Sequence, residues 1–394
     1  MTRSKVQFGK RPRAPQAVLI IVATRSRRER NLLHLCGGVC ARMRRRGRSI
    51  IGRLGLSWLR GEKALVSGLD IIGDVHACAS LLKARLTDLG YAPDETTGAY
   101  RHPERRAVFV GDLIDRGPEQ LEALQLVKAM ADSDTADVVM GNHEFNAITY
   151  ATKHPKTGEF LREHNEHNAS QHSAFLNLSE DDQRYYIDWF KTLPLWLDLG
   201  GVRVVHACWH PESMRAVIDA CGSNRLTTVA HYAEAVTKDT ELHAAVEVLL
   251  KGPEIDLDPY GLPPFKIGGP KLRYEARIRW WKHDDTTLRE LAELRGATLE
   301  NGDLYPVIPG DILVDPEIRR SYLYTDSVPL FYGHYWRDWE PVHKDDWTAH
   351  TACVDFSAER DGTLVAYRWS GEPTITWRNY RPHTTDVVEH EPSQ

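Results

Sequence analysis

Five short motifs bring together carboxylates, imidazoles and an amide. They are GDVH at 73–76, GDLIDRG at 111–117, GNHE at 141–144, VVHAC at 204–208 and FYGHYW at 331–336. Oxygen and nitrogen ligands without thiolates suit divalent manganese, iron or zinc. Two such cations held close together could activate a water molecule and neutralise the charge of a phosphoryl group.

An apolar segment that is typical of a buried β-strand leads into each motif. Strands are expected at 69–72, 107–110, 137–140, 202–205 and 328–332, and further strands near 351–356 and 363–369. Helices are expected at about 77–89 and 119–131. The 34 residues between His76 and Gly111 and the 24 between Arg116 and Gly141 suit a helix and its turns between neighbouring parallel strands. The motifs should therefore meet at the carboxyl edge of a sheet, where open α/β folds place their sites.

The five motifs, in this order, resemble those of the calcineurin-like metallophosphoesterases of the phosphoprotein-phosphatase type. The resemblance covers about residues 69–370 and is strongest to bacterial symmetrical diadenosine tetraphosphatases and bacterial Ser/Thr protein phosphatases. It implies an α/β fold, a four-layer α/β/β/α metallophosphatase sandwich, here with a helical and irregular insertion. Ala77 stands where the family usually has glycine. Since both residues are small, close packing beside the metals should survive.

The resemblance also implies roles for nine residues of this chain. Six are expected to bind two divalent metal ions: Asp74 and His76 at the first, Asp112 as the bridge, and Asn142, His206 and His334 at the second. Three are expected to act on the phosphoryl group: His143 as general acid, Asp115 to orient its ring, and Arg116 to bind phosphate. Simpler readings stay open, in which the aspartates cap helices, His143 has no catalytic role, and Asp115 and Arg116 form a structural ion pair.

The activity that the resemblance implies is hydrolysis of phosphomonoesters or nucleoside polyphosphates by direct attack of a metal-bound hydroxide. Manganese is the expected metal, with iron or zinc as alternatives. Two substrates stay open: a Ser/Thr phosphoprotein and a symmetrically cleaved dinucleoside tetraphosphate. A different class of function is a non-catalytic scaffold with a basic arm that binds nucleic acid. The intact set of ligand residues argues against that scaffold.

Charge divides the chain into a basic leader and an acidic body. Residues 1–67 hold 17 Lys and Arg and two Glu, a net charge of +15, which leaves −20 for the rest. The leader is predicted to be a disordered extension or the product of a mis-assigned start, with a nucleic-acid-binding arm or a membrane-binding helix as the alternative. The metallophosphoesterase domain is expected at 68–375, with insertions at about 150–200 and 211–325. A flexible tail is expected at 376–394.

Composition argues against a disulfide-rich secreted protein and against a membrane-spanning protein. Hydrophobic residues make up 42% and charged residues 27%, as in globular domains. The six cysteines follow no framework, which indicates reduced thiols and a cytoplasmic protein. No apolar run reaches the ~18–20 residues of a membrane-spanning helix. The expected partners are a phosphorylated small molecule, a dinucleoside polyphosphate or a phosphoprotein. A membrane is not expected, and nucleic acid is expected only through the leader.

Two further segments have two interpretations each. KGPE at 251–254 and RIRWW at 277–281 could place cations and an indole near a nucleotide or phosphorylated substrate. A solvated insertion with a packed tryptophan pair is the favoured reading. Four histidines at 154, 164, 167 and 172 could line the entrance to the site, although a solvated helix face is favoured.

Overall fold

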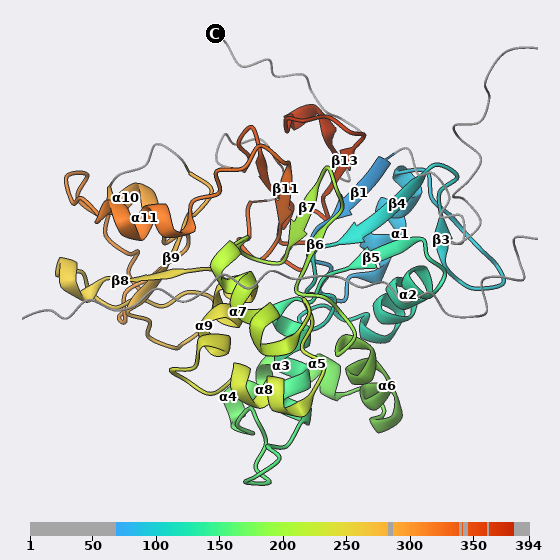
Figure 1. Ribbon diagram of the computed structural model, residues 1–394, viewed down its shortest axis with the longest axis horizontal. Coiled ribbons are helices and arrows are strands. Elements are labelled where there is room, and N and C mark those ends of the chain that lie inside the picture. The colour runs from blue at the N-terminus through green and yellow to red at the C-terminus, as the bar shows by residue number, and fades with distance from the viewer. Residues whose placement is uncertain (1–67, 283–286, 339–340, 342–345, 361, 382–394) are drawn as a thin grey trace, which may run out of the picture. The chain divides into compact units, whose positions relative to one another are not determined.

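The computed structural model describes residues 68–282, 287–338, 341, 346–360 and 362–381, so the predicted leader lies outside the described residues. Two β-sheets form the centre of the described part (Figure 1). The larger sheet has the order β14-β13-β1-β4-β5. Its strands are β1 (Gly68–Ile72), β4 (Arg105–Phe109), β5 (Ala136–Val138), β13 (Ala366–Trp369) and β14 (Tyr380–Arg381). As the motif spacing predicts, β1, β4 and β5 pair in parallel, whereas β13 and β14 pair antiparallel.

The second sheet carries the two later histidine motifs. It has the order β12-β11-β7-β6. Its strands are β6 (Trp196–Asp198), β7 (Arg203–Val205), β11 (Leu330–Tyr332) and β12 (Thr351–Cys353). The last three run parallel, and β6 pairs antiparallel with β7. Parallel pairing puts the residues that follow β7 and β11 at one edge of this sheet.

Side-chain alternation along the strands builds the layers. One apolar cluster, which includes Ile71, Val108, Val204 and Phe331, collects buried residues from both sheets. Their strand neighbours, such as Phe109, belong to a second cluster shared with the helices. Because successive side chains of a strand point to opposite faces, the first cluster lies between the sheets. The predicted α/β/β/α sandwich is therefore confirmed.

Helices cover the outer faces of both sheets. Helices α1 (Ala79–Asp88) and α2 (Gln120–Asp132) contribute to the outer cluster on the β1-β4-β5 side, with a short β2 (Ala92–Pro93) and β3 (Tyr100–Arg101) between β1 and β4. Helices α7 (Pro211–Cys221), α8 (Val229–Ala235) and α9 (Glu241–Lys251) follow β7. The N–H of Ala207 donates to the carbonyl of Leu249 in α9 at 3.0 Å. These helices thus belong to a core layer, and the insertion predicted from 211 begins after them.

Two segments extend this sandwich. After β5 come α3 (Asn142–Ala151), α4 (Glu166–Gln171), α5 (Ser173–Leu176) and α6 (Glu180–Phe190), in the region predicted to be helical. After α9 come β8 (Glu254–Asp256), η1 (Asp258–Tyr260), β9 (Glu275–Ile278), α10 (Leu288–Leu291), β10 (Ala292–Glu293) and α11 (Pro316–Tyr322). Here β10, β9 and β8 pair in a small sheet, drawn at the left of Figure 1. The sequence predicted only irregular structure there, because strands this short show no readable period.

The flexible tail predicted from residue 376 is wrong for its first residues. Residues 377–381 form η2 (Trp377–Asn379) and β14, which pairs with β13. Tyr380 is 4% exposed, and its hydroxyl donates to the carbonyl of Cys353 at 2.9 Å. Residues 382–394 lie outside the described part.

Two predictions drawn from composition can be compared with the structure. Cys78, Cys208, Cys221 and Cys353 are free thiols. Among the described residues, no helix is both long and apolar enough to cross a membrane. The cytoplasmic location stays a prediction.

The burial of Tyr380 leads to a stability prediction. Tyr380→Ala should lower the free energy of unfolding by about 3 kcal/mol, because the change leaves a cavity in the core. Tyr274→Ala is the control; Tyr274 is 57% exposed, and its loss should cost less than about 0.5 kcal/mol. Urea unfolding followed by tryptophan fluorescence measures both. Equal stability of the two variants would contradict the placement of β14.

Candidate metal centre

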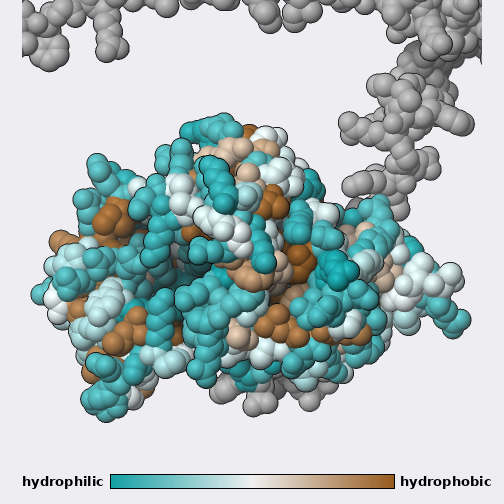
Figure 2. Space-filling view, turned by 90° about the horizontal axis from the view of Figure 1, so that it is seen from below, coloured by the Kyte–Doolittle hydropathy of each residue, from teal (hydrophilic) through white to brown (hydrophobic). Residues whose placement is uncertain are grey.

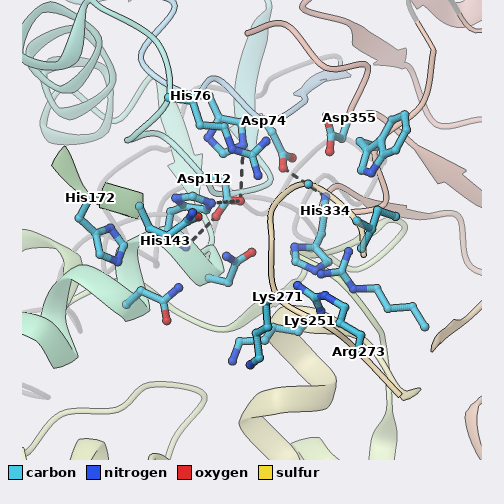
Figure 3. A pocket seen from close by; sticks show the side chains of 18 of the residues that line it. Asp74, His76, Asp112, His143, His172, Lys251, Lys271, Arg273, His334 and Asp355 are labelled. Carbon is cyan, nitrogen blue, oxygen red and sulfur yellow. Dashed lines mark hydrogen bonds and ion pairs between the residues drawn. The ribbon is translucent and has the colours of Figure 1, made fainter. Parts of the chain in front are cut away.

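The six predicted ligand residues meet around one buried carboxylate, and Figure 3 labels Asp74, His76, Asp112 and His334 among them. They follow the strands of both sheets: Asp74 and His76 after β1, Asp112 after β4, Asn142 after β5, His206 after β7 and His334 after β11. Asp112 is 2% exposed. Its Oδ1 lies 3.4 Å from Nε2 of His206, and its Oδ2 lies 3.7 Å from Nε2 of His76. A carboxylate between two such sets of ligands is placed to bridge two cations.

Backbone carbonyls orient two of the imidazoles. Nδ1 of His76 lies 3.0 Å from the carbonyl of Ile114, and Nδ1 of His206 lies 2.8 Å from that of Val110. A carbonyl can only accept, so each Nδ1 carries a ring hydrogen and each Nε2 faces Asp112. Burial, helped by the positive charge of Arg116, lowers the pKa of His76 to about 3. Both rings are therefore suited to bind metal through Nε2.

Several buried polar atoms at this site lack hydrogen-bond partners in the described part of the chain, which shows whether the site fits metal ions. Oδ1 of Asp74 and Nε2 of His334 are buried and have no hydrogen-bond partner among the described residues. Oδ1 of Asn142 lies 3.0 Å from Nε2 of His206, so two acceptors face each other when the ring hydrogen is on Nδ1. Burial and the nearby Asp355 and Asp112 raise the pKa of Asp74. Two divalent cations would satisfy these acceptors and offset the clustered negative charge, so the residues fit the metals.

The motif loops adopt left-handed backbone conformations that side chains rarely take. The φ angle is 41° at His76, 50° at Asp112 and 63° at His334. Strain of this kind is concentrated at functional sites, where the surrounding structure enforces it. At two motif positions there is no space for a side chain, so only glycine fits. A Cβ at Gly141 would lie 2.2 Å from Oδ1 of Asp112, and one at Gly333 would lie 2.0 Å from Oδ1 of Asp74.

Ala77, which departs from the glycine usual in the family, also has a left-handed backbone, with φ of 54°. It is fully buried. Alanine pays roughly 1 kcal/mol for this conformation, which glycine adopts freely. Its methyl group is accommodated, as expected for a small residue.

Glu144 positions the loop that carries Asp112, a role that the sequence analysis missed. Its buried carboxylate accepts the N–H groups of Asp112 at 2.9 Å, Leu113 at 2.8 Å and Gly141 at 2.9 Å. It therefore ties the loop after β4 to the start of α3. The signal was present as the last residue of GNHE, but nothing local indicates which loop it binds.

His143 is held by Asp115, and the structure adds a second histidine. Nδ1 of His143 lies 2.6 Å from Oδ2 of Asp115, and Nδ1 of His172 lies 2.7 Å from the same oxygen. Burial opposes protonation of His143, but Asp112 and the hydrogen bond to Asp115 raise its pKa. His172 is 1% exposed, so the solvated helix face favoured for this group of histidines is wrong at 172. His164 is exposed but lies before α4 and stacks on Tyr150 and Phe160. His167 is exposed on α4 and lines the cavity, as the alternative reading of this group predicts.

Arg116 does not form the ion pair with Asp115 that was considered as an alternative. Its guanidinium pairs with Glu359, while Asp115 binds the two histidines. Arg116 lines the same cavity as the ligand residues. Its side chain is 38% exposed, so it can reach a bound phosphoryl group.

The cavity at this site has a volume of about 540 Å³. On the face seen in Figure 2 the surface is hollowed and largely hydrophilic. Lys251, Glu254 and Arg277 line the cavity, as the substrate-facing reading of KGPE and RIRWW predicts. The same reading is wrong for Trp280 and Trp281, which are each 1% exposed and pack edge to face.

Comparisons with known proteins agree with this geometry. Residues 69–243 match the calcineurin-like phosphoesterase family. The chain therefore carries a calcineurin-like metallophosphoesterase domain, and proteins of this family are metal-dependent hydrolases with a dinuclear divalent centre.

Two curated relatives share parts of this domain. One is the asymmetrical bis(5'-nucleosyl)-tetraphosphatase PrpE of Halalkalibacterium halodurans, 49% identical over 19% of this chain and 30% of that protein. Another is the symmetrical bis(5'-nucleosyl)-tetraphosphatase of Aromatoleum aromaticum, 31% identical over 37% of this chain and 47% of that protein. The matches thus span less than half the length of both relatives. A solved protein Ser/Thr phosphatase of Saccharomyces cerevisiae is 13% identical, with a TM-score of 0.45 over 84% of this chain and 83% of its own.

The contacts of Glu144 predict an effect on metal content. Glu144→Gln turns an amide nitrogen toward backbone N–H groups, so Asp112 should lose its position and the bound metal should fall from two ions per chain to below one. Metal analysis of gel-filtered protein measures this number. Glu122→Gln, at an exposed residue of α2, is the matched control and should keep two ions. Two ions retained in Glu144→Gln would contradict the role of this carboxylate.

Proposed function

We propose that this chain is a two-metal phosphoesterase that hydrolyses phosphate ester or anhydride bonds, with manganese as the working metal. One observation carries the proposal: Asp112 lies buried between the imidazoles of His76 and His206, with acceptors that lack partners on both sides. Asp74 and His76 would hold one ion, Asn142, His206 and His334 would hold the other, and Asp112 would be a ligand to both. When bound, the two ions supply an activated water and neutralise phosphoryl charge.

The remaining groups bind the phosphoryl group and move a proton. Arg116 presents its planar guanidinium to the phosphoryl oxygens. The Nε2 atom of His143 lies 3.9 Å from Oδ2 of Asp112. It carries a proton, which it donates to the leaving oxygen. Asp115 accepts from Nδ1 of both His143 and His172, which fixes the ring of His143. His172 is thus a positioning residue in this proposal.

The names of the curated relatives bear on the substrate class. The curated relatives are named for dinucleoside tetraphosphates, which favours a nucleoside polyphosphate over a phosphoprotein. Both substrates would meet the same metals and the same Arg116, so the metal centre does not separate them.

Product analysis tests the proposal directly. Full-length protein with manganese is offered diadenosine tetraphosphate and a singly phosphorylated peptide in parallel. ADP as the sole nucleotide product indicates symmetrical cleavage, AMP with ATP indicates asymmetrical cleavage, and orthophosphate from the peptide alone indicates a protein phosphatase. Chelation with EDTA should abolish every activity. Absence of metal-dependent turnover would contradict the proposal and favour the scaffold.

In the same assay Asp112→Asn should lower turnover by about 1,000-fold or more, because an amide cannot bridge two cations as a carboxylate does. Asparagine tolerates the left-handed backbone at this position, so the fold should persist. Asp132→Asn, on the exposed side of α2, is the control with unchanged turnover. Full activity of Asp112→Asn would refute the bridging role.

The proton-donor role predicts a dependence on the leaving group. His143→Ala should slow hydrolysis of phenyl phosphate by roughly 100-fold or more, but that of p-nitrophenyl phosphate by much less, because p-nitrophenolate leaves without a proton. His172→Ala should show the same bias at about a tenth of the size. Values of kcat for both esters measure it. Equal losses on the two esters would remove the general-acid role.

A further inference from the structure

The cavity wall opposite Asp74 and Asp112 is rich in cations. Lys251 at the end of α9, Lys271 and Arg273 before β9, and Arg277 within β9 all line the cavity. In Figure 3, Lys251, Lys271 and Arg273 lie across open space from the carboxylates, on the far side of His334. Arg116 already lies on the metal side, where its charge acts on His76 and Asp112. Glu247 and Glu254 line the same cavity, but the cations of the far wall outnumber these carboxylates. The wall therefore holds positive charge beyond what one phosphoryl group at the metals would use.

Most of this charge has no protein partner. Lys251 pairs with Glu247 at 2.5 Å. Within the described part of the chain, no carboxylate forms an ion pair with Lys271, Arg273 or Arg277. The Nε groups of Arg273 and Arg277 are buried and have no hydrogen-bond partner among the described residues. A buried donor without an acceptor costs free energy because it has lost its hydrogen bonds to water. An anion bound in the cavity could accept hydrogen bonds from these guanidinium groups.

The small sheet of the insertion fixes Arg277 in this unfavourable place. Its strand neighbours are Glu254 in β8 and Glu293 in β10, yet neither carboxylate forms an ion pair with it. Its guanidinium instead lies 6.0 Å from the ring centroid of Tyr335, the residue after His334. Burial and the charge of Arg273 lower the pKa of Arg277. The side chain is thus held beside the metal ligands and turned toward the cavity.

We propose that Lys271, Arg273 and Arg277 form a second anion subsite, which binds phosphate beyond the one at the metals. The preferred substrate then carries a chain of at least two linked phosphates. Guanidinium groups suit this role because their fixed donors match phosphate oxygens. A singly phosphorylated side chain of a protein would leave this wall unused.

The reaction on such a chain consumes one water. The water oxygen bonds to the phosphorus at the metals, and the bond from that phosphorus to the bridging oxygen breaks. The bridging oxygen keeps the electron pair, takes the proton that His143 donates, and leaves on the phosphate that the subsite holds. The proton that the attacking water loses passes to solvent, and His143 takes up a proton again. The cations of the subsite neutralise the charge that develops on this leaving phosphate. This subsite rests on the proposed function for its reaction, but its binding can be measured without turnover.

The test compares two ligands that cannot be hydrolysed. Calorimetry on the full-length, manganese-loaded protein uses the bis-methylene analogue of tripolyphosphate and, as a single-anion probe, methylphosphonate. The double variant K271Q/R273Q should bind the tripolyphosphate analogue at least about tenfold more weakly, with a smaller change for methylphosphonate. Arg320→Gln, at an exposed position of α11 in the same insertion, removes one positive charge outside the cavity. This control should bind both ligands like the unaltered protein.

Two further results complete the test. Arg277→Gln should weaken the tripolyphosphate analogue, and Arg277→Lys should restore part of the affinity; Lys271 is exposed and Arg273 half-buried, so the double variant remains informative even if Arg277→Gln does not fold. Unchanged binding of the analogue in K271Q/R273Q overturns the subsite, even when p-nitrophenyl phosphate is hydrolysed. Loss of binding in that variant supports the subsite. Failure of the unaltered protein to hydrolyse any phosphoester counts against the proposed function alone.

Discussion

The negative charge of the buried Asp112 carboxylate is the constraint on which the site depends. Imidazoles surround it and the backbone N–H of His143 donates to it, while Asp74 and Asp355 add further buried carboxylates nearby. Protein groups alone leave acceptors such as Oδ1 of Asp74 without partners. Two divalent cations would offset this charge and supply the missing partners. The left-handed loops and the hydrogen bonds of Glu144 hold Asp112 and the residues around it in place.

The two-sheet sandwich explains how residues from Asp74 to His334 reach one place. Parallel strands end at a common edge, and the two sheets pack through a shared apolar core, so the loops after β1, β4, β7 and β11 converge. The insertion after α9 contributes no predicted metal ligand. It supplies instead the cationic wall around Arg277, across the cavity from the carboxylates. The two-sheet core thus positions the candidate metal-binding residues, and the insertion positions the cations that face the substrate.

The sequence predicted the parts of the site that are local. Asp74, Asp112 and His206 each follow an apolar strand within a few residues, so both the strand and the candidate ligand could be recognised. His172 could not, because it lies 57 residues from Asp115 in a polar helical segment. Glu359 lies 243 residues from Arg116 and was missed for the same reason. The strand at Tyr380 is two residues long, and its stability comes from packing that no local pattern shows.

Anomalous diffraction at the manganese edge tests the central claim most directly. Crystals of the full-length protein grown with manganese should show two peaks about 4 Å apart, each next to one oxygen of Asp112. Such a pair would place the bridging carboxylate where the account requires it. A single peak, or peaks away from Asp112, would contradict the two-metal centre and with it the proposed chemistry.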